Sequence, residues 1–330
     1  MAQQNPDYMD TDNLTINRQS HITVGRMLEG MQDDLELEVL SGYQGLGRRV
    51  LTPDVNRPGL ALAGYLDFFS SDRLQMLGNT EIHFMRKQNT AELQHRLERL
   101  FSFEIPAFVI SRGLEPLPIL MDECNRRGIP LIRSSQSTGK IMSRTILFLS
   151  EEFSPETMVH ATAVDCYGVG CLIVGTPGVG KSETALELVE RGHRLIADDV
   201  VALKLKREHW LYAESSPVIE HHMEIRGIGI IDIKSVYGVG HVRNSKRIGL
   251  VVELEEWNPE GKYDRTGLTD EFVDILGVRV PRLVIPVRPG RNIAIILEVA
   301  ALNHRLKEMG INPAHALNER LKTMMSDSDE

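Results

Sequence analysis

The sequence predicts an α/β fold of two domains, and three observations lead to this expectation. The chain has 330 residues, more than one hydrophobic core usually organises, because domains commonly hold roughly 150 residues each. In both halves, short apolar runs alternate with segments of helical composition, the order found in sheets covered by helices. In the second half, the apolar run CLIV leads directly into the glycine-rich stretch GTPGVGKSE. We therefore expect a C-terminal α/β domain built around this loop, preceded by a smaller α/β domain.

Composition and charge narrow the class of protein. Hydrophobic residues make up 42% and charged residues 25% of the chain, which is typical of a soluble globular protein. The net charge of -9 disfavours nucleic acid as the main partner. The three cysteines show no C-x-x-C spacing and fit reduced thiols rather than a zinc site. With no leader pattern and no apolar run long enough to span a bilayer, we expect a cytoplasmic protein without a membrane partner.

The N-terminal half is expected to hold one α/β domain behind a disordered extension. Residues 1–20 lack apolar periodicity and have the polar composition of a frayed terminus. Residues 35–40, LELEVL, alternate like a half-buried strand. Further on, PAFVIS, PILMDECNRRG and IPLIRSS indicate a strand, a helix closed by Gly128 and a second strand, which together make a βαβ unit.

A boundary between the domains is expected after the next helix. TGKIMSRTILFLSEEF has a helical pattern, although we interpret its TGK, residues 138–140, as an ordinary loop because it lacks the upstream glycine of a phosphate loop. Residues 151–157, EEFSPET, have the polar, proline-containing character of a linker. We therefore expect domains at residues 21–152 and 153–325, with an acidic tail at residues 326–330.

The C-terminal half has an order of elements that is typical of a nucleotide site. An apolar run ends at Gly175, the glycine-rich loop follows, and SETALELVERG predicts a helix that stops at Gly192. HRLIADDVVALKL then indicates a buried strand that ends in the pair Asp198 and Asp199. A strand, a glycine loop, a helix and a strand ending in an acid form the layout of a phosphate-binding domain.

The glycine-rich loop satisfies the pattern G-x-x-x-x-G-K-[ST] in full, which ordinary composition produces in about 1% of chains of this length. Its glycines let backbone N–H groups turn toward phosphates, and the following helix presents its N-terminus to the same anion. Lys181 supplies a cation for the β and γ oxygens, and the Ser182 hydroxyl can ligate Mg²⁺. A merely tight turn would not require both residues. The nucleotide is therefore expected to contact Gly175, Thr176, Pro177, Gly178, Val179, Gly180, Lys181 and Ser182.

The acid pair that follows has two explanations. Asp198 and Asp199 can hold the water shell of a metal or take a proton from an attacking hydroxyl, or they can be a helix cap or a solvated loop pair. Adjacent carboxylates raise the pKa of one another, so one can act as a base while its neighbour serves the metal.

The motifs of the common phosphate-transferring classes are missing. The chain contains neither the N-K-x-D motif with which a GTPase reads its base nor the H-R-D and D-F-G motifs of eukaryotic-type protein kinases. A further segment, MEIRGIGIIDIKSVYGVG at residues 223–240, places an acid and an arginine immediately before G-x-G. That G-x-G is a weak signal when it is taken alone.

The run GVGKSETALELVERGHRLIADD, followed by EIRGIGIIDI and VIPVRPGRN, resembles HPr kinase/phosphorylase, a bacterial enzyme family of carbon catabolite regulation. The resemblance extends from about residue 21 to about residue 321 and includes NRPGLALAGY. It implies a C-terminal P-loop kinase domain of the phosphoenolpyruvate-carboxykinase-like type and a homohexamer. It also implies that ATP or pyrophosphate phosphorylates a serine of the phosphocarrier protein HPr, or of a paralogue. The reverse reaction is phosphorolysis, in which inorganic phosphate removes the phosphoryl group and pyrophosphate forms.

The resemblance also implies a role for individual residues. It makes His160 and Arg265 catalytic, Lys181 the phosphate-site lysine, and Asp199 the base in one direction and the acid in the other. Its metal ligands are Ser182 and Glu224, and its phosphorolysis segment is Pro286, Val287, Arg288, Pro289, Gly290 and Arg291. The family usually has His-Gly where this chain has His160-Ala161.

Without the resemblance, these residues have simpler explanations. His160 could be an ordinary surface or half-buried histidine, and Glu224 a solvated acid. Arg265 could pair with the aspartate beside it, and Arg288 and Arg291 could flank a solvated turn.

Two other functions stay open on the residues alone: a P-loop kinase of a small metabolite, and a non-catalytic ATP-binding regulator. The segment IAIILEVAALNHRLKEMG is apolar around much of its helical circumference, which suits burial against a neighbouring subunit or within the chain.

Overall fold

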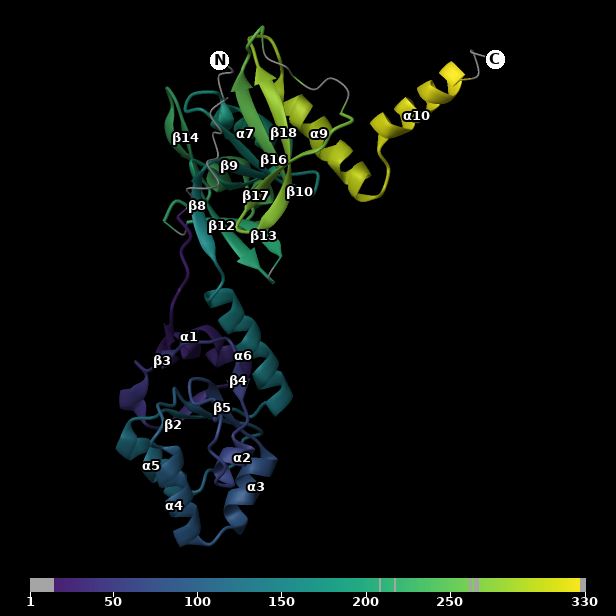
Figure 1. The fold of residues 1–330 in the computed structure, drawn as a ribbon. Coiled ribbons are helices and arrows are strands. Elements are labelled where there is room, and N and C mark those ends of the chain that lie inside the picture. Colours follow the sequence, from purple (N-terminus) through teal and green to yellow (C-terminus); the bar gives the residue numbers. More distant parts are fainter. Residues whose placement is uncertain (1–14, 208, 217, 261–262, 264–266, 327–330) are drawn as a thin grey trace. The chain divides into compact units, whose positions relative to one another are not determined.

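The computed structural model describes residues 15–207, 209–216, 218–260, 263 and 267–326. They form two compact units (Figure 1). The N-terminal unit spans Arg18–Ser154, and the C-terminal unit holds the described residues from Pro155 onward together with residues 15–17. The expected α/β fold with two domains is confirmed.

The N-terminal unit is a five-stranded sheet with helices on both faces. The strand order is β2-β7-β6-β5-β4, in which β4 to β7 are parallel and β2 is antiparallel to β7. A short antiparallel pair, β1 and β3, lies outside this sheet. The strands are β1 (Ile22–Thr23), β2 (Glu38–Ser41), β3 (Arg49–Val50), β4 (Val55–Asn56), β5 (Leu74–Leu77), β6 (Phe108–Ile110) and β7 (Leu131–Arg133).

Two hydrophobic clusters fill the spaces on either side of this sheet. One lies beneath α1 and α6, and the other beneath α2 to α5, as the two layers of helices in Figure 1 show. These helices are α1 (Val24–Leu35), α2 (Gly59–Leu62), α3 (Asn79–Lys87), α4 (Thr90–Leu100), α5 (Pro118–Arg127) and α6 (Thr138–Glu152), with a 3-10 turn at Tyr43–Gly45.

The predicted βαβ unit is confirmed by β6, α5 and β7. The two strands are parallel, and Gly128 ends α5 in the left-handed region at φ 58°. The TGK interpretation was wrong, because residues 138–140 form the first turn of α6, where the Ser137 hydroxyl accepts a hydrogen bond from the amide of Lys140. The strand expected at residues 35–40 was placed too early, because Leu35 is buried on α1 and β2 starts at Glu38.

The C-terminal unit is built on a sheet of nine strands among the described residues. The strand order is β11-β9-β10-β16-β13-β12-β8, with β18 paired to β16 and β17 paired to β18. Only the pairs β10 with β16 and β16 with β18 are parallel. The strands are β8 (Glu156–His160), β9 (Thr162–Cys166), β10 (Val169–Gly175), β11 (Arg194–Ala197), β12 (Val200–Lys206), β13 (Trp210–Ser215), β16 (Ser245–Glu256), β17 (Glu271–Ile275) and β18 (Val278–Val287).

Two helices cover one face of this sheet, and a hairpin stands beside them. The helices α7 and α9 share a hydrophobic cluster with β10, β16 and the hairpin of β14 and β15. These elements are α7 (Lys181–Glu190), α9 (Ile293–Glu308), β14 (His222–Ile225) and β15 (Gly229–Asp232), followed by α8 (Ile233–Tyr237) and a 3-10 turn at Val239–His241.

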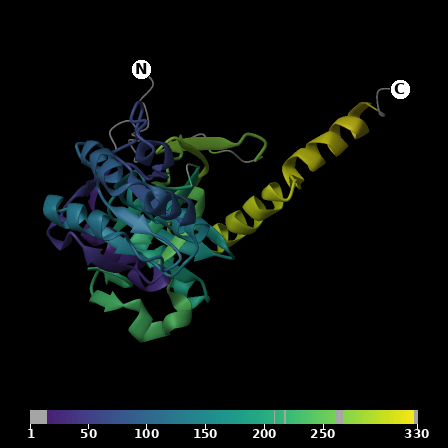
Figure 2. The same ribbon diagram turned by 90° about the horizontal axis from the view of Figure 1, so that it is seen from below.

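The final helix, α10 (Pro313–Ser326), extends away from the sheet of its unit, as Figure 2 shows. Its side chains Leu317, Leu321 and Met324 are exposed. On α9, Ile293, Ala294, Leu297 and Ala301 are buried against the sheet, whereas Ile295, Val299, Leu302 and Leu306 are exposed. The packing of α9 within the chain therefore uses one side of the helix.

Three expectations about element boundaries need correction. The expected linker at residues 151–157 is shorter, because α6 runs to Glu152 and β8 begins at Glu156. The extension expected at residues 1–20 is not wholly outside the fold, because Asn17 and Glu156 exchange two backbone hydrogen bonds of 2.8 and 2.9 Å. The single strand expected around Asp198 is two strands, β11 and β12, with the acid pair at the corner between them.

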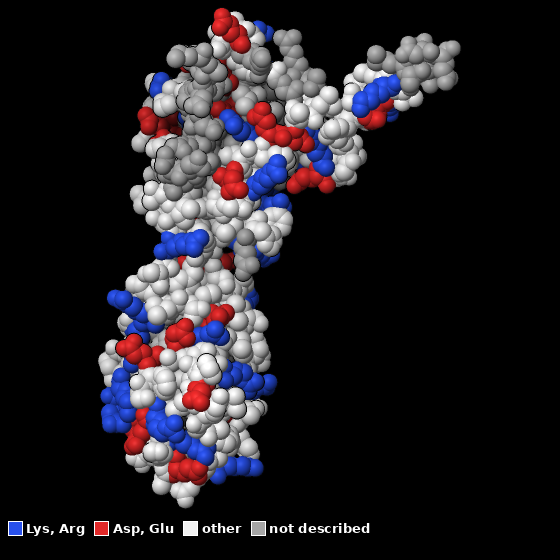
Figure 3. All heavy atoms as spheres, viewed as in Figure 1, with Lys and Arg blue, Asp and Glu red and all other residues white. Residues whose placement is uncertain are grey.

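Acidic and basic side chains are intermixed on the face of each unit that Figure 3 shows. In the described part of the chain, no helix combines the length and apolar composition that a bilayer crossing would need.

Candidate active site

The three parallel strands of the C-terminal unit end at one edge of the sheet. Gly175 at the end of β10 lies level with Leu254 of β16, which in turn lies level with Ile285 of β18. The loops that leave these strands therefore start beside one another. In open α/β sheets, ligands bind outside the carboxyl ends of the strands. The glycine-rich loop leaves β10 at this edge, and the segment 286–291 leaves β18 there.

The loop at residues 175–180 has the backbone of a phosphate cradle. Gly175, Gly178 and Gly180 have φ values of 145°, 87° and 103°, which side chains rarely permit. A Cβ on Gly175 would also lie 2.4 Å from the carbonyl oxygen of Leu254. Since α7 begins at Lys181 directly after the loop, its N-terminal amides face the same space. The Lys181 Nζ donates hydrogen bonds to the carbonyl oxygens of Gly175 (3.1 Å) and Thr176 (3.3 Å).

Asp198 is a buried carboxylate that two hydroxyl groups hold in place. Its Oδ1 accepts hydrogen bonds from Thr162 (2.7 Å) and Ser182 (3.0 Å), so β9 and α7 both fix it. Its Oδ2 is buried and lacks a hydrogen-bond partner among the described residues. Burial raises the pKa of Asp198, although the two hydroxyls and the nearby amides of Asp199 and Glu224 oppose the rise. The direction agrees with the sequence expectation, but the cause is burial rather than a neighbouring carboxylate.

Asp199 is exposed although it follows Asp198 directly. Its φ of 63° lies in the left-handed region, which turns its side chain away from the buried neighbour. The carboxylate is 71% exposed and the imidazole of His160 is 86% exposed, with 3.8 Å between Oδ1 and Nδ1. The amide of Ala161 donates a hydrogen bond to the carbonyl oxygen of Asp199 at 3.2 Å. Ala161 thus provides a backbone contact that holds His160 and Asp199 together.

The β14–β15 hairpin brings Glu224 and Arg226 to the same side of the site. Glu224 is exposed, and its backbone amide lies near enough to Asp198 to lower the pKa of that carboxylate. The guanidinium of Arg226 covers the loop, because its Nη1 would lie 3.3 Å from a Cβ placed on Gly178.

No role was predicted for Arg226 from the sequence. A signal was nevertheless present, because Arg226 begins the turn that directly follows β14, the strand that carries Glu224. Glu224, which the resemblance had already singled out, stands two positions before Arg226.

The donor set suits a magnesium ion that is bound together with phosphates. Mg²⁺ usually takes one or two carboxylates, and waters and substrate phosphates complete its octahedron. The unpartnered Oδ2 of Asp198, close to the Ser182 hydroxyl, is such a partial site, and Glu224 on β14 has its backbone amide near the same carboxylate. No cluster of three or more His, Cys, Asp or Glu side chains suited to a metal occurs among the described residues. An all-protein metal cage therefore has no support in the described part of the chain.

The segment 286–291 is connected to the helix of the phosphate loop. Asn292 caps α9 and donates a hydrogen bond to Glu187 of α7, so the segment is held beside that helix. Arg291 donates to the carbonyl oxygen of Pro286 at 3.0 Å. Neither Arg288 nor Arg291 is hydrogen-bonded to the loop 175–180 in the described structure. The predicted catalytic Arg265 lies outside the described residues.

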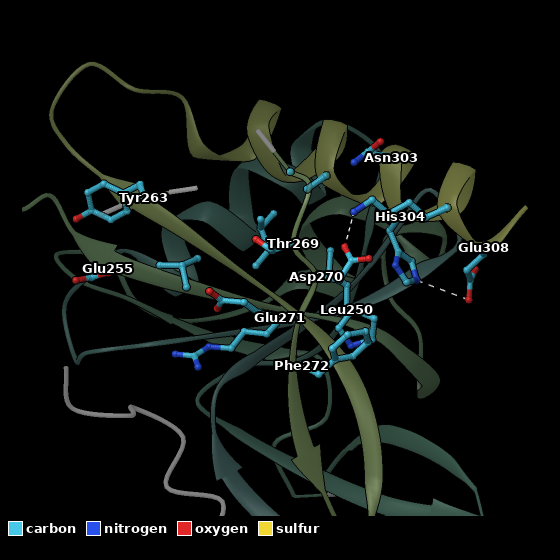
Figure 4. A pocket seen from close by; sticks show the side chains of 17 residues that line it. Leu250, Glu255, Tyr263, Thr269, Asp270, Glu271, Phe272, Asn303, His304 and Glu308 are labelled. Atoms are coloured by element: carbon cyan, nitrogen blue, oxygen red, sulfur yellow. Dashed lines mark hydrogen bonds and ion pairs between the residues drawn. The ribbon is translucent and has the colours of Figure 1, made fainter. Parts of the chain in front are cut away.

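A cavity of about 520 Å³ lies between α9 and the strands β16, β17 and β18 (Figure 4). Tyr263 and Glu255 stand at one end of it, and His304 and Glu308 at the other. Of the site residues predicted from the sequence, none that the structure describes lines this cavity.

The chain matches two protein-family models. Residues 22–149 match the model described as HPr Serine kinase N terminus, and residues 151–321 match the HPr Serine kinase C-terminal domain. The first segment lies within the N-terminal unit, and the second covers the sheet of the C-terminal unit and extends into α10.

Curated relatives match along nearly their whole length. The HPr kinase/phosphorylase of Geobacillus kaustophilus (strain HTA426) is 47% identical over 295 residues, which are 89% of this chain and 95% of the relative. The protein of the same name from Halalkalibacterium halodurans is 43% identical over 309 residues, or 94% of this chain and 98% of the relative. A solved structure of the Hpr(Ser) kinase/phosphatase from Coxiella burnetii is 34% identical, covers 49% of this chain and 98% of its own, and has a TM-score of 0.44.

Proposed function

The chain belongs to the HPr serine kinase family, and from this membership we propose that it phosphorylates a serine of the phosphocarrier protein HPr and reverses that reaction. The donor in the forward direction is ATP or pyrophosphate. In the reverse direction inorganic phosphate attacks the phosphoserine and pyrophosphate leaves. The observation that carries the proposal is the phosphate loop with an exposed Asp199 beside a buried Asp198.

Phosphoryl transfer depends mainly on positioning and on the neutralisation of charge. The amides of the loop 175–180 and of the first turn of α7 would bind the phosphates of the donor. Lys181, which now donates to two loop carbonyls, would turn to the phosphate oxygens, and Arg226 would cover them from the hairpin. A bound Mg²⁺ supplies further charge neutralisation, with Ser182, Asp198 and Glu224 as the residues that would hold it.

Asp199 serves as the proton carrier in both directions. In the forward direction it accepts the proton of the attacking serine hydroxyl as the serine oxygen–phosphorus bond forms and the donor's bridging bond breaks. In the reverse direction it returns a proton to the leaving serine oxygen while a phosphate oxygen bonds to phosphorus, as microscopic reversibility requires. His160, whose Nδ1 lies 3.8 Å from Oδ1 of Asp199, would hold the carboxylate or the incoming phosphate.

The burial pattern supports this division of labour between the two aspartates. Asp198 cannot meet a protein substrate, because it is 4% exposed and bonded to two hydroxyls. Asp199 is open to a large partner. The exposed apolar side chains of α9 and α10 support self-association of the chain. The homohexamer and the cytoplasmic role in carbon catabolite regulation rest on the family resemblance alone.

The proposal is tested by incubating the protein with Mg²⁺, ATP and purified HPr, and by locating the modification with mass spectrometry. Phosphoserine on HPr is the expected result. The matched control is Lys181→Ala, which removes the loop cation and should abolish transfer while circular dichroism stays unchanged. Phosphorylation of a small hydroxylated metabolite with none on HPr would favour the metabolite kinase instead.

A further inference from the structure

An aromatic pair lies at the same edge of the sheet as the phosphate loop, and the proposed function gives it no role. Trp257 directly follows β16, the strand beside β10, and stands three residues beyond Leu254, which is level with Gly175. At about 3.3 Å per residue along a strand and about 4.8 Å between strands, Trp257 starts roughly 10 Å beyond the first glycine of the loop and one strand to its side. Trp257 therefore lies within reach of the base of a nucleotide whose phosphates occupy the loop.

The geometry of the pair is that of a stacking platform. The rings of Trp257 and Tyr263 are nearly parallel, with 5.2 Å between their centroids and 19° between their planes. The backbone amide of Trp257 donates to the carbonyl oxygen of Val287 at 2.9 Å, which fixes the start of the loop to β18. The amide of Asn258 donates to the Tyr263 hydroxyl at 3.0 Å and holds the second ring in place.

The pair is accessible rather than part of a core. Trp257 is 40% exposed. Tyr263 lines one end of the 520 Å³ cavity, where Figure 4 shows its ring apart from the other labelled side chains. The other tryptophan of the chain, Trp210, lies on β13, with the guanidinium of Arg247 only 3.5 Å from its ring centroid.

A positive charge stands over the platform. The Arg288 guanidinium lies 5.4 Å from the centroid of the Trp257 ring, and Arg288 belongs to the segment that leaves β18 at this same edge. An arginine against an aromatic face both rigidifies the ring and attracts an electron-rich heterocycle or a phosphate. The platform thus links a surface for a planar ring to the segment assigned to phosphate chemistry.

We propose that Trp257 and Tyr263 form the subsite for the nucleobase of the phosphoryl donor, on which a purine ring adds to the existing stack. The assignment rests on the proposed function, because it presupposes that the loop 175–180 binds a nucleoside triphosphate. Aromatic faces bind bases with little sequence preference, since every base has a π-face. The subsite therefore contributes affinity for the donor without strict selection of adenine.

The two donors make a direct test, because pyrophosphate has no base. Isothermal titration with Mg²⁺ and either ATP or pyrophosphate is carried out on the unmodified protein and on Trp257→Ala and Tyr263→Ala. We expect the Kd for ATP to rise about tenfold in each variant, as the loss of one base–aromatic stack does elsewhere, and the Kd for pyrophosphate to stay unchanged. Trp257→Phe and Tyr263→Phe keep a ring at each position and should retain most of the affinity for ATP.

Equal weakening of ATP and pyrophosphate binding would overturn the subsite and give the pair a purely structural role. An unchanged Kd for ATP with weaker binding of HPr would also overturn it, in favour of a surface for the protein substrate. A second measurement does not depend on the alanine variants being folded. In Trp210→Phe, Trp257 is the remaining tryptophan, and its fluorescence should change on addition of ATP but not of pyrophosphate.

The proposed function fails separately from the subsite. If the protein binds ATP and pyrophosphate yet transfers no phosphoryl group to HPr, the proposed function is refuted. A fluorescence change with ATP but not with pyrophosphate would still support the subsite. If ATP binds and leaves the Trp257 fluorescence unchanged, the subsite is refuted even when transfer to HPr is observed.

Discussion

The imidazole of His160 and the carboxylate of Asp199 face one another at 3.8 Å, Nδ1 to Oδ1. The β8–β12 ladder creates this arrangement, since Val200, the residue after Asp199, pairs with His160. Two residues that are far apart in the sequence thus meet at an exposed corner. The left-handed backbone of Asp199 is a local strain of the kind that often marks active sites.

Asp199→Asn should lower the rates of both directions of the reaction about a thousandfold, because an amide cannot carry the shared proton. Asparagine tolerates the left-handed backbone, so the fold should be kept. Initial rates of HPr phosphorylation and of phosphorolysis, with calorimetry of ATP binding as the control, check this expectation. Loss of only one of the two activities would refute the shared-proton role.

Arg226→Ala should weaken ATP and pyrophosphate binding alike, by roughly tenfold to a hundredfold, because it removes a charged donor from the phosphates that both ligands share. Gly178→Ala is the companion change: a Cβ at φ 87° strains the loop and meets the Arg226 guanidinium. Both variants differ from Trp257→Ala, which should affect ATP alone. Full retention of pyrophosphate affinity in Arg226→Ala would remove Arg226 from the phosphate site.

Removal of the metal should expose the role of Asp198. With EDTA present, ATP affinity should fall about tenfold or more, since the oxygens of the phosphates and of Asp198 lose their common counter-charge. Asp198→Asn keeps one oxygen for Thr162 and Ser182 and should show weak ATP binding with or without Mg²⁺. Isothermal titration calorimetry of ATP binding, once with Mg²⁺ and once with EDTA, compares the unmodified protein with the variant. Equal metal dependence in the unmodified protein and the variant would show that Asp198 does not serve the metal.

Glu298 on α9 should stabilise the C-terminal unit in a pH-dependent manner. Its carboxylate accepts hydrogen bonds from Arg191 (2.9 Å to Oε1) and His193 (2.9 Å), so it connects α9 to the end of α7. The bond from Arg191 is the main cause of the lowered pKa of Glu298. A lowered pKa in the folded state means that the contribution is present above the ordinary value of 4.5 and disappears as the pH falls through the folded value.

Glu298→Gln should therefore lower the free energy of unfolding by about 2 kcal/mol at pH 7, with a smaller difference below pH 4.5. Urea unfolding of the unmodified protein and the variant at several pH values measures this difference in the free energy of unfolding. Glu308→Gln, an exposed change on the same helix, is the matched control and should have little effect. A difference that does not shrink in acid would mean that packing, and not charge, connects the two helices.

Local sequence patterns predicted the loop and the helix of the phosphate site, because their chemistry requires adjacent residues. The pattern from Gly175 to Ser182 determines glycine conformations and a helix start within eight residues. The βαβ unit around Gly128 was predictable for the same reason. The TGK of residues 138–140 was misread because the Ser137 cap outweighed the glycine that follows.

Relationships that depend on strand pairing were not visible in the sequence. Asp198 and Asp199 were read as the end of one strand, because a corner between two consecutive strands leaves no mark in an apolar run. Arg226 reaches the loop only through the hairpin of β14 and β15, and Trp257 reaches the same edge only through its register with β10. Such contacts join residues from distant segments, so their residue types alone gave no sign of them.

We propose that one site catalyses both phosphoryl transfer to HPr and phosphorolysis of serine-phosphorylated HPr. The product of the reverse reaction is the sharpest test of this proposal. Serine-phosphorylated HPr is incubated with the protein, Mg²⁺ and inorganic phosphate, and the released compound is identified by ³¹P nuclear magnetic resonance. We predict one pyrophosphate for each phosphoserine lost, and no release when inorganic phosphate is omitted. Release of orthophosphate in the absence of added phosphate would show hydrolysis by water and would refute phosphorolysis at this site.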